Sequence, residues 1–153
     1  MEELMSTPDI RPADGFAGHI TPQDAWQILA TDERAVLVDV RTEGEWRTIG
    51  VADVSSLDKE TVYTPWVTQL GPNPHFLDPI LEAGVTPGDG RTLVFLCRSG
   101  NRSIGAAAAA TAAGLGPAYN VLEGFEGDAD ALGVRNQNGW RVAGLPSTTW
   151  TSA

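Results

Sequence analysis

Three short apolar runs place the strongest limit on what this chain can fold into. They span residues 35–40, 93–97 and 118–122. The first two lack the polar alternation of a half-exposed strand, and the third repeats their character more weakly. Such runs are typical of strands buried on both faces of a parallel sheet. We therefore expect an α/β fold with a central, mostly parallel β-sheet flanked by helices on both faces.

The segments between these runs carry helix signals. A helix is expected from Thr21 to Asp32, because Thr-Pro is a helix-start signal and apolar residues then recur at helical spacing. Residues 101–113 are rich in alanine and precede Gly114, a common residue at helix ends. A helical run is also expected over residues 76–83. From Gly124 onward we expect a last short helix and then a tail packed by Trp140 and Leu145.

The length and charge of the chain limit its organisation and its partners. We expect one domain over residues 19–150, preceded by a flexible N-terminal lead-in at residues 1–18. The formal charge of −10 disfavours nucleic acid and anionic membrane surfaces as partners. The start of the chain lacks the pattern of a secretory signal, and the longest apolar stretch, residues 104–116, is too short to span a bilayer. A cytoplasmic location is the expectation.

The most informative stretch is Cys97-Arg98-Ser99-Gly100-Asn101-Arg102-Ser103, called the Cys97 loop below. Ligands of parallel sheets bind beyond the carboxyl ends of the strands, where this loop would lie. Amide groups and the helix dipole at such a turn favour an anion, and a thiolate is one. The two arginines can form forked hydrogen bonds to an oxyanion. The small Ser99 and Gly100 let the loop curl so that its amides converge.

Cys97 is the single cysteine of the chain. It can therefore form no intramolecular disulfide, and a mechanism with a resolving cysteine from the same chain is excluded. An isolated cysteine at a strand end is usually a small buried hydrophobic residue. The flanking residues of the loop favour a reactive thiol instead. His19 and His75 lie in no recognisable motif, so we interpret each as a surface or turn histidine and assign it no role.

The Cys97 loop resembles the active-site loop of rhodanese-like sulfurtransferases. Residues 38–41 and 43–46 resemble the family's Asp-Val-Arg segment and the acidic-aromatic pair after it, in the family's order and spacing. Residues 123–128 resemble its Gly-rich element after the last core strand, and the likeness extends over about residues 20–147. Residues 48–53 depart from the family's His-Ile-Pro-Gly-Ala segment. The stretch from Tyr63 to Phe76 is expected to shape the entrance of the site in its place, with Trp66 near the mouth.

The resemblance implies a sulfurtransferase with the rhodanese-like fold. Cys97 would attack the sulfane sulfur of a small anionic donor such as thiosulfate, expel sulfite and carry the sulfur as a persulfide. A thiol, cyanide or a protein sulfur acceptor would then remove it. Asp39, Arg41 and Glu45 would form a supporting ion-pair network, and neither a cofactor nor a metal is implied. The substrate-binding residues would be those of the loop, Arg98, Ser99, Gly100, Asn101, Arg102 and Ser103.

Two alternatives share this architecture. A cysteine phosphatase of the Cdc25 type places five residues between its cysteine and arginine, whereas four separate Cys97 from Arg102. The shorter loop favours a sulfur atom over a tetrahedral phosphate. A non-enzymatic rhodanese module for regulation or protein binding is the second alternative, since fold alone does not determine function. Such modules often lack the cysteine, which this chain retains.

Overall fold

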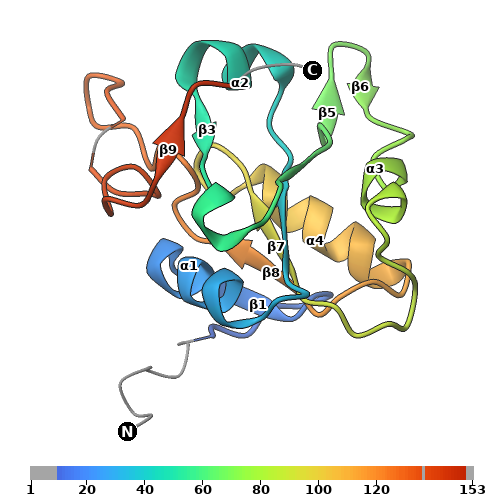
Figure 1. The fold of residues 1–153 in the computed structure, drawn as a ribbon. Coiled ribbons are helices and arrows are strands. Elements are labelled where there is room, and N and C mark those ends of the chain that lie inside the picture. The colour runs from blue at the N-terminus through green and yellow to red at the C-terminus, as the bar shows by residue number, and fades with distance from the viewer. Residues whose placement is uncertain (1–9, 136, 151–153) are drawn as a thin grey trace, which may run out of the picture.

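Five parallel strands form the central sheet of the computed structural model, which describes residues 10–135 and 137–150 (Figure 1). Their order across the sheet is β1-β8-β7-β2-β4, and all four neighbouring pairs are parallel. The parallel α/β sheet predicted from the sequence is therefore confirmed. The strands are β1 (Gly18–Ile20), β2 (Val36–Asp39), β4 (Val62–Tyr63), β7 (Leu93–Leu96) and β8 (Ala118–Val121).

The central strand β7 shows why the apolar runs lack alternation. Leu93 and Phe95 face one hydrophobic cluster, whereas Val94 and Leu96 face a second cluster on the other side of the sheet. All four side chains are fully buried. Because successive side chains of a strand point to opposite faces, Cys97 extends the first of these two rows. The cysteine is thereby directed to the same face as Phe95.

Helices cover both faces of the sheet, as predicted (Figure 1). Helix α1 (Pro22–Thr31) buries Ala25 and Leu29 against one face. Helices α3 (Asp78–Glu82) and α4 (Arg102–Ala112) contribute to the cluster on the other face. Helix α2 (Glu43–Ile49) follows β2 and starts with a capping box, in which Thr42 and Glu45 satisfy each other's backbone amides.

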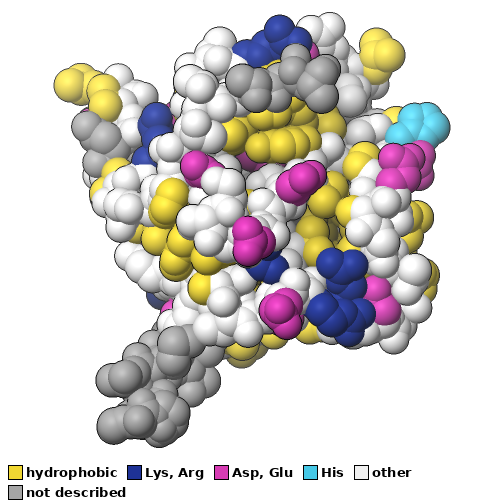
Figure 2. Space-filling model, in the orientation of Figure 1, with side chains coloured by type: hydrophobic (Ala, Val, Ile, Leu, Met, Phe, Trp, Pro, Cys, Tyr) yellow, Lys and Arg dark blue, Asp and Glu magenta, His cyan; other side chains and the backbone are white. Residues whose placement is uncertain are grey.

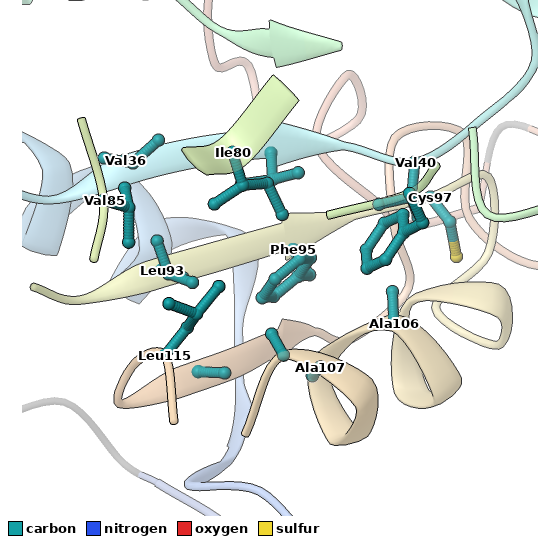
Figure 3. Close-up of a cluster of buried hydrophobic side chains, with 14 residues drawn as sticks. Val36, Val40, Ile80, Val85, Leu93, Phe95, Cys97, Ala106, Ala107 and Leu115 are labelled. Carbon is teal, nitrogen blue, oxygen red and sulfur yellow. The ribbon is translucent and has the colours of Figure 1, made fainter. Parts of the chain in front are cut away.

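The alanines of α4 let this helix approach the sheet closely. Ala106, Ala107 and Ala110 are completely buried, and Figure 3 shows the first two beside Phe95. Gly105 lets Trp66 approach the helix, because a Cβ atom there would lie 3.0 Å from the Trp66 ring. The first turn of α4 thus contacts this indole as well as the sheet.

The prediction of a last short helix after Gly124 is wrong. In residues 124–135 and 137–150 the structure shows turns and a two-residue strand, β9 (Ser147–Thr148), antiparallel to β3 (Val51–Ala52). Glycines with positive φ recur through this segment and interrupt any regular helix. The tail nevertheless packs as expected at Trp140, which is completely buried on the α1 face.

The remaining elements lie at the edges of the molecule. A short 3-10 helix, η2 (Ser55–Leu57), follows β3, and strands β5 (Val67–Thr68) and β6 (Gly71–Pro72) form a hairpin. Residues 1–9 of the expected lead-in lie outside the described part of the chain. Within its remainder, Arg11 pairs with His19 of β1 through two backbone hydrogen bonds.

Surface charges are mixed on the face drawn in Figure 2. Lys and Arg side chains lie there among Asp and Glu side chains and do not merge into one continuous cationic surface. Among the described residues, no helix combines the length and the apolar character needed to cross a membrane.

Candidate functional site

Cys97 follows the last residue of β7 and precedes α4. Its side chain lies on the α4 face of the sheet, and Figure 3 shows the sulfur directed toward the start of that helix. The residue is only 1% exposed. The strand-to-helix turn predicted from the sequence therefore holds a buried thiol at the carboxyl end of the central strand.

Two hydrogen-bond donors face the sulfur. The amide of Gly100 donates to Sγ at 3.1 Å, and the hydroxyl of Ser103 lies 3.2 Å from it. Gly100 has φ of +95°, a conformation that suits glycine and turns the loop back over the sulfur. Hydrogen bonds to the charged form stabilise a thiolate. The loop is thus arranged to favour negative charge on Sγ.

Asn120 of β8 contacts both residues that supply these donors. Its Nδ2 donates to the carbonyl oxygen of Gly100 at 3.1 Å, and its Oδ1 accepts from the Ser103 hydroxyl. The same Nδ2 lies 2.9 Å from Nδ1 of His19. Asn120 is 1% exposed, so this amide is a buried polar group with a partner at each end.

The two histidines differ in their surroundings. His75 lies in a turn with 79% of its side chain exposed, as expected from the sequence. His19 belongs to strand β1 and not to a turn, and its side chain is partly buried. The short strand β1 brings it next to Asn120 because these residues are paired in the parallel register of β1 and β8.

Each loop arginine has a carboxylate partner. Both terminal nitrogens of Arg102 donate to Glu45 at 2.8 Å, and Nε of Arg98 lies 2.9 Å from Oε2 of Glu126. Burial alone would raise the pKa of Glu45, but hydrogen bonds from Arg102 and Thr42 and the charge of Arg102 lower it to about 2. An anionic donor would therefore have to compete with carboxylates for both guanidinium groups.

Asp39 and Arg41 form a third, deeper ion pair at the end of β2. The carboxylate accepts from Nε and Nη2 of Arg41, the shortest contact being 2.7 Å, and also from Nε1 of Trp46 at 3.0 Å. Both charged side chains are essentially unexposed. The guanidinium also lies 4.5 Å from the ring centroid of Phe125. The expected supporting residues thus belong to two ion pairs, because Glu45 binds Arg102 instead.

The segment after β8 supports the start of the loop. The amide of Phe125 donates to the carbonyl of Cys97 at 2.8 Å, and that of Glu126 donates to the carbonyl of Arg98 at 2.9 Å. A Cβ atom on Gly124 would lie 2.5 Å from the Cys97 carbonyl oxygen. Glycine is required here because the two backbones approach so closely.

The remaining predicted residues lie around the loop. Ser99 and Asn101 are joined by a side-chain hydrogen bond of 3.2 Å on the outer side. They line a surface pocket of about 310 Å³ together with His19 and Asn120. Trp66 is partly buried against Phe76 with ring centroids 4.9 Å apart, and its ring lies against Gly105 in the first turn of α4. Within the described residues, no group of three or more His, Cys, Asp or Glu side chains is arranged to hold a metal ion.

Three residues that belong to the site were not predicted from the sequence: His19, Asn120 and Glu126. A signal existed for Asn120, because it is the single amide side chain within an otherwise apolar strand run, and a buried amide needs partners. Glu126 is 4% exposed, but an acid in a glycine-rich segment reads as a surface residue. Its burial becomes visible only in the folded chain.

Comparisons with known proteins agree with this geometry. A family model described as "Rhodanese-like domain" matches residues 21–131. The "Uncharacterized protein RC0915" of Rickettsia conorii is 34% identical over 128 residues, which cover 84% of this chain and 94% of that protein. The crystal structure of Rv0390 from M. tuberculosis has a TM-score of 0.79 and 52% identity, covering 88% of this chain and 99% of that one.

A more distant structure shares the fold. It is the solution structure of the polysulfide-sulfur transferase homodimer from Wolinella succinogenes, with a TM-score of 0.54 and 21% identity over 84% of this chain and 75% of that one.

Proposed function

The chain belongs to the rhodanese-like domain family, and from this premise we propose that it is a sulfurtransferase in which Cys97 carries the transferred sulfur as a persulfide. The donor is a small anion with a sulfane sulfur, such as thiosulfate, and the acceptor is a thiol, cyanide or a protein. The name of the Wolinella polysulfide-sulfur transferase fits this proposal.

One observation carries the proposal: the sulfur of Cys97 is faced by the Gly100 amide and the Ser103 hydroxyl at the amino end of α4. These donors and the helix dipole stabilise a thiolate, which is the nucleophilic form of cysteine. They are equally placed to stabilise the anionic terminal sulfur of a persulfide. A buried structural cysteine has no need of two polar partners.

The chemistry needs only Cys97 as a covalent carrier. The thiolate attacks the outer sulfur of thiosulfate, a new S–S bond forms, and the S–S bond of thiosulfate breaks as sulfite leaves with the electron pair. An acceptor nucleophile then attacks the terminal sulfur of the persulfide and regenerates the thiolate. This is double displacement through a covalent intermediate, and no electrons are exchanged with a cofactor.

Access to the sulfur depends on the residues around it. Cys97 is 1% exposed, so a donor reaches it only after side chains at the loop move. Arg98 is the more exposed of the two loop arginines, with 43% of its side chain accessible, and the buried Glu126 keeps Arg141 at 3.8 Å as a second cation when Arg98 turns away. We place the approach of the anionic donor on that side of the loop.

Mass spectrometry of the intact protein tests the proposal. Incubation with thiosulfate should add the mass of one sulfur atom to the wild-type chain and none to Cys97→Ser, and cyanide should remove the addition and release thiocyanate. Because Cys97 is the single cysteine, the adduct needs no further mapping. A wild-type protein that stays unmodified with thiosulfate and with inorganic polysulfide would refute the function.

Parallel assays separate the alternatives. Turnover of a phosphate monoester without sulfur transfer would identify a cysteine phosphatase. A folded protein that shows neither activity would identify a non-enzymatic module. Four residues between Cys97 and Arg102 favour the sulfur substrate over phosphate.

A further inference from the structure

We propose that Asn120 is a positioning residue for the thiolate of Cys97 and that His19 holds Asn120 in its working orientation. This inference deepens the function proposed above and rests on Cys97 reacting as a thiolate. Neither residue touches the sulfur. Both act through the two groups that do.

The register of the sheet brings these residues into one row. His19 of β1 is paired with Asn120 of β8, and Asn120 is paired with Phe95 of β7. Side chains at paired positions of neighbouring strands project from the same face. Cys97 lies two residues beyond Phe95 and therefore projects from this face as well. Asn120 can reach the loop because its strand is the direct neighbour of the strand that carries the cysteine.

Asn120 holds both donors of the sulfur at once. Its Nδ2 binds the carbonyl of Gly100 at 3.1 Å, which holds that residue in its left-handed conformation with the amide on Sγ. Its Oδ1 contacts the Ser103 hydroxyl, whose oxygen lies 3.2 Å from Sγ. One buried side chain thus determines where two separate hydrogen bonds to the sulfur originate.

The orientation of the amide follows from its partners. The Gly100 carbonyl can only accept a hydrogen bond, so the NH2 end of Asn120 must face it, and Oδ1 must face Ser103. The second N–H then points to Nδ1 of His19 at 2.9 Å, which must act as the acceptor. His19 thereby disfavours the flipped amide, in which Oδ1 would face two acceptors.

The Ser103 hydroxyl has one hydrogen, and two neighbouring atoms can accept it: Oδ1 of Asn120 and Sγ of Cys97. This shared hydrogen links Asn120 to the charge on the sulfur. When Cys97 is a thiol, the hydroxyl donates to Oδ1 of Asn120 and can accept from the S–H group. When Cys97 is a thiolate or a persulfide anion, the sulfur becomes the stronger acceptor, and the hydrogen is shared between Sγ and Oδ1 in a three-centre hydrogen bond. Asn120 therefore still contacts the Ser103 oxygen through this shared hydrogen.

A pH titration of the thiolate tests this role directly. The ultraviolet absorbance of the thiolate is measured as the difference between each variant and the same variant carrying Cys97→Ser. We expect Asn120→Leu to raise the midpoint by about one pH unit, because it removes the support of both donors. Asn120→Asp should raise it further, because it adds a negative charge and loses the donor to Gly100.

Matched variants separate positioning from folding. Ser103→Ala removes one donor. The midpoint shift of the double variant Ser103→Ala/Asn120→Leu should be smaller than the sum of the two single shifts, because both substitutions act on the same hydrogen bond. His19→Gln retains an acceptor for Asn120 and should stay near wild type, whereas His19→Leu should shift the midpoint by about half a unit. Circular dichroism and cooperative thermal unfolding verify that each variant is folded.

The outcomes distinguish this proposal from the one it rests on. Folded Asn120→Leu and His19→Leu proteins that titrate like wild type would overturn the positioning role, whatever the protein does with thiosulfate. If the midpoints of the variants shift but the wild-type protein accepts no sulfur, the positioning role is supported and the sulfurtransferase function is refuted. Shifted midpoints together with slower sulfur loading at pH 7, recovered at higher pH, would support both.

Discussion

Replacing Glu45 by Gln removes one charge from the ion pair that joins α2 to α4. Glu45 accepts from both terminal nitrogens of Arg102 at 2.8 Å, with 19% and 29% of the two side chains exposed. It also completes the capping box with Thr42. Gln can still cap the helix and accept one hydrogen bond from Arg102. The substitution therefore removes the negative charge and one of the two hydrogen bonds to Arg102.

The magnitude follows from the pKa of Glu45. Burial opposes ionisation, yet hydrogen bonds from Arg102 and Thr42 and the charge of Arg102 lower this pKa from 4.5 to about 2. Each pKa unit corresponds to about 1.4 kcal/mol, so the ionised carboxylate stabilises the folded state by about 3 kcal/mol. Gln retains part of the hydrogen bonding. We expect Glu45→Gln to lower the free energy of unfolding by about 2 kcal/mol at pH 7.

The difference between the proteins should depend on pH. The unfolded chain binds its proton near the ordinary value of 4.5, above the pKa of about 2 in the folded state. The stabilisation is therefore fully present above about pH 5 and is lost as the pH falls toward 2. At pH 3 the difference between wild type and Glu45→Gln should be below half of its value at pH 7.

Urea unfolding followed by tryptophan fluorescence at several pH values measures this difference. Glu43→Gln is the matched control, since it removes the same charge from the same helix turn. Its partner is Arg47, and more than half of each side chain is exposed, so we expect a loss of about 0.5 kcal/mol. Equal losses for the two variants, or a Glu45→Gln effect that is the same at pH 3 and pH 7, would refute the reasoning.

Two further substitutions probe the support of the site. Asp39→Asn leaves the guanidinium of Arg41 buried without a counter-charge, and we expect it to lower the free energy of unfolding in urea by about 3 to 5 kcal/mol. Gly124→Ala places a Cβ atom 2.5 Å from the Cys97 carbonyl oxygen and should cost about 3 kcal/mol and slow alkylation of Cys97. Gly88→Ala also has a positive φ but open space around it, so it should cost about 1 kcal/mol and leave the cysteine unaffected.

The central strands could be predicted because a strand that is buried on both faces is a continuous run of mostly apolar residues. β2 and β7 each consist of four buried residues, and each coincides with an apolar run of the sequence. The edge strands β1 and β4 span three and two residues and depend on pairing with β8 and β2. Segments this short carry no periodicity of their own. They become strands because a neighbour offers free backbone groups.

The predicted last helix does not form because the glycines of this segment are used for close backbone packing. Gly124, Gly127 and Gly139 all have positive φ, and each lies against other backbone so closely that a side chain would clash. These glycines serve close packing of the segment after β8 against the Cys97 loop and itself. In a single sequence, glycines that allow such contacts look the same as glycines that merely separate helices.

The Cys97 loop was predictable because its chemistry is local, whereas its partners come from both neighbouring strands. On one side β8 supplies the uncharged Asn120, and on the other α2, which follows β2, supplies the charged Glu45. The strand order that brings them together is not encoded in any one segment. The two sides do different work as a result. The two residues that face the sulfur, Gly100 and Ser103, contact the neutral amide of Asn120, whereas an ion pair joins Arg102 of the loop to Glu45 of α2.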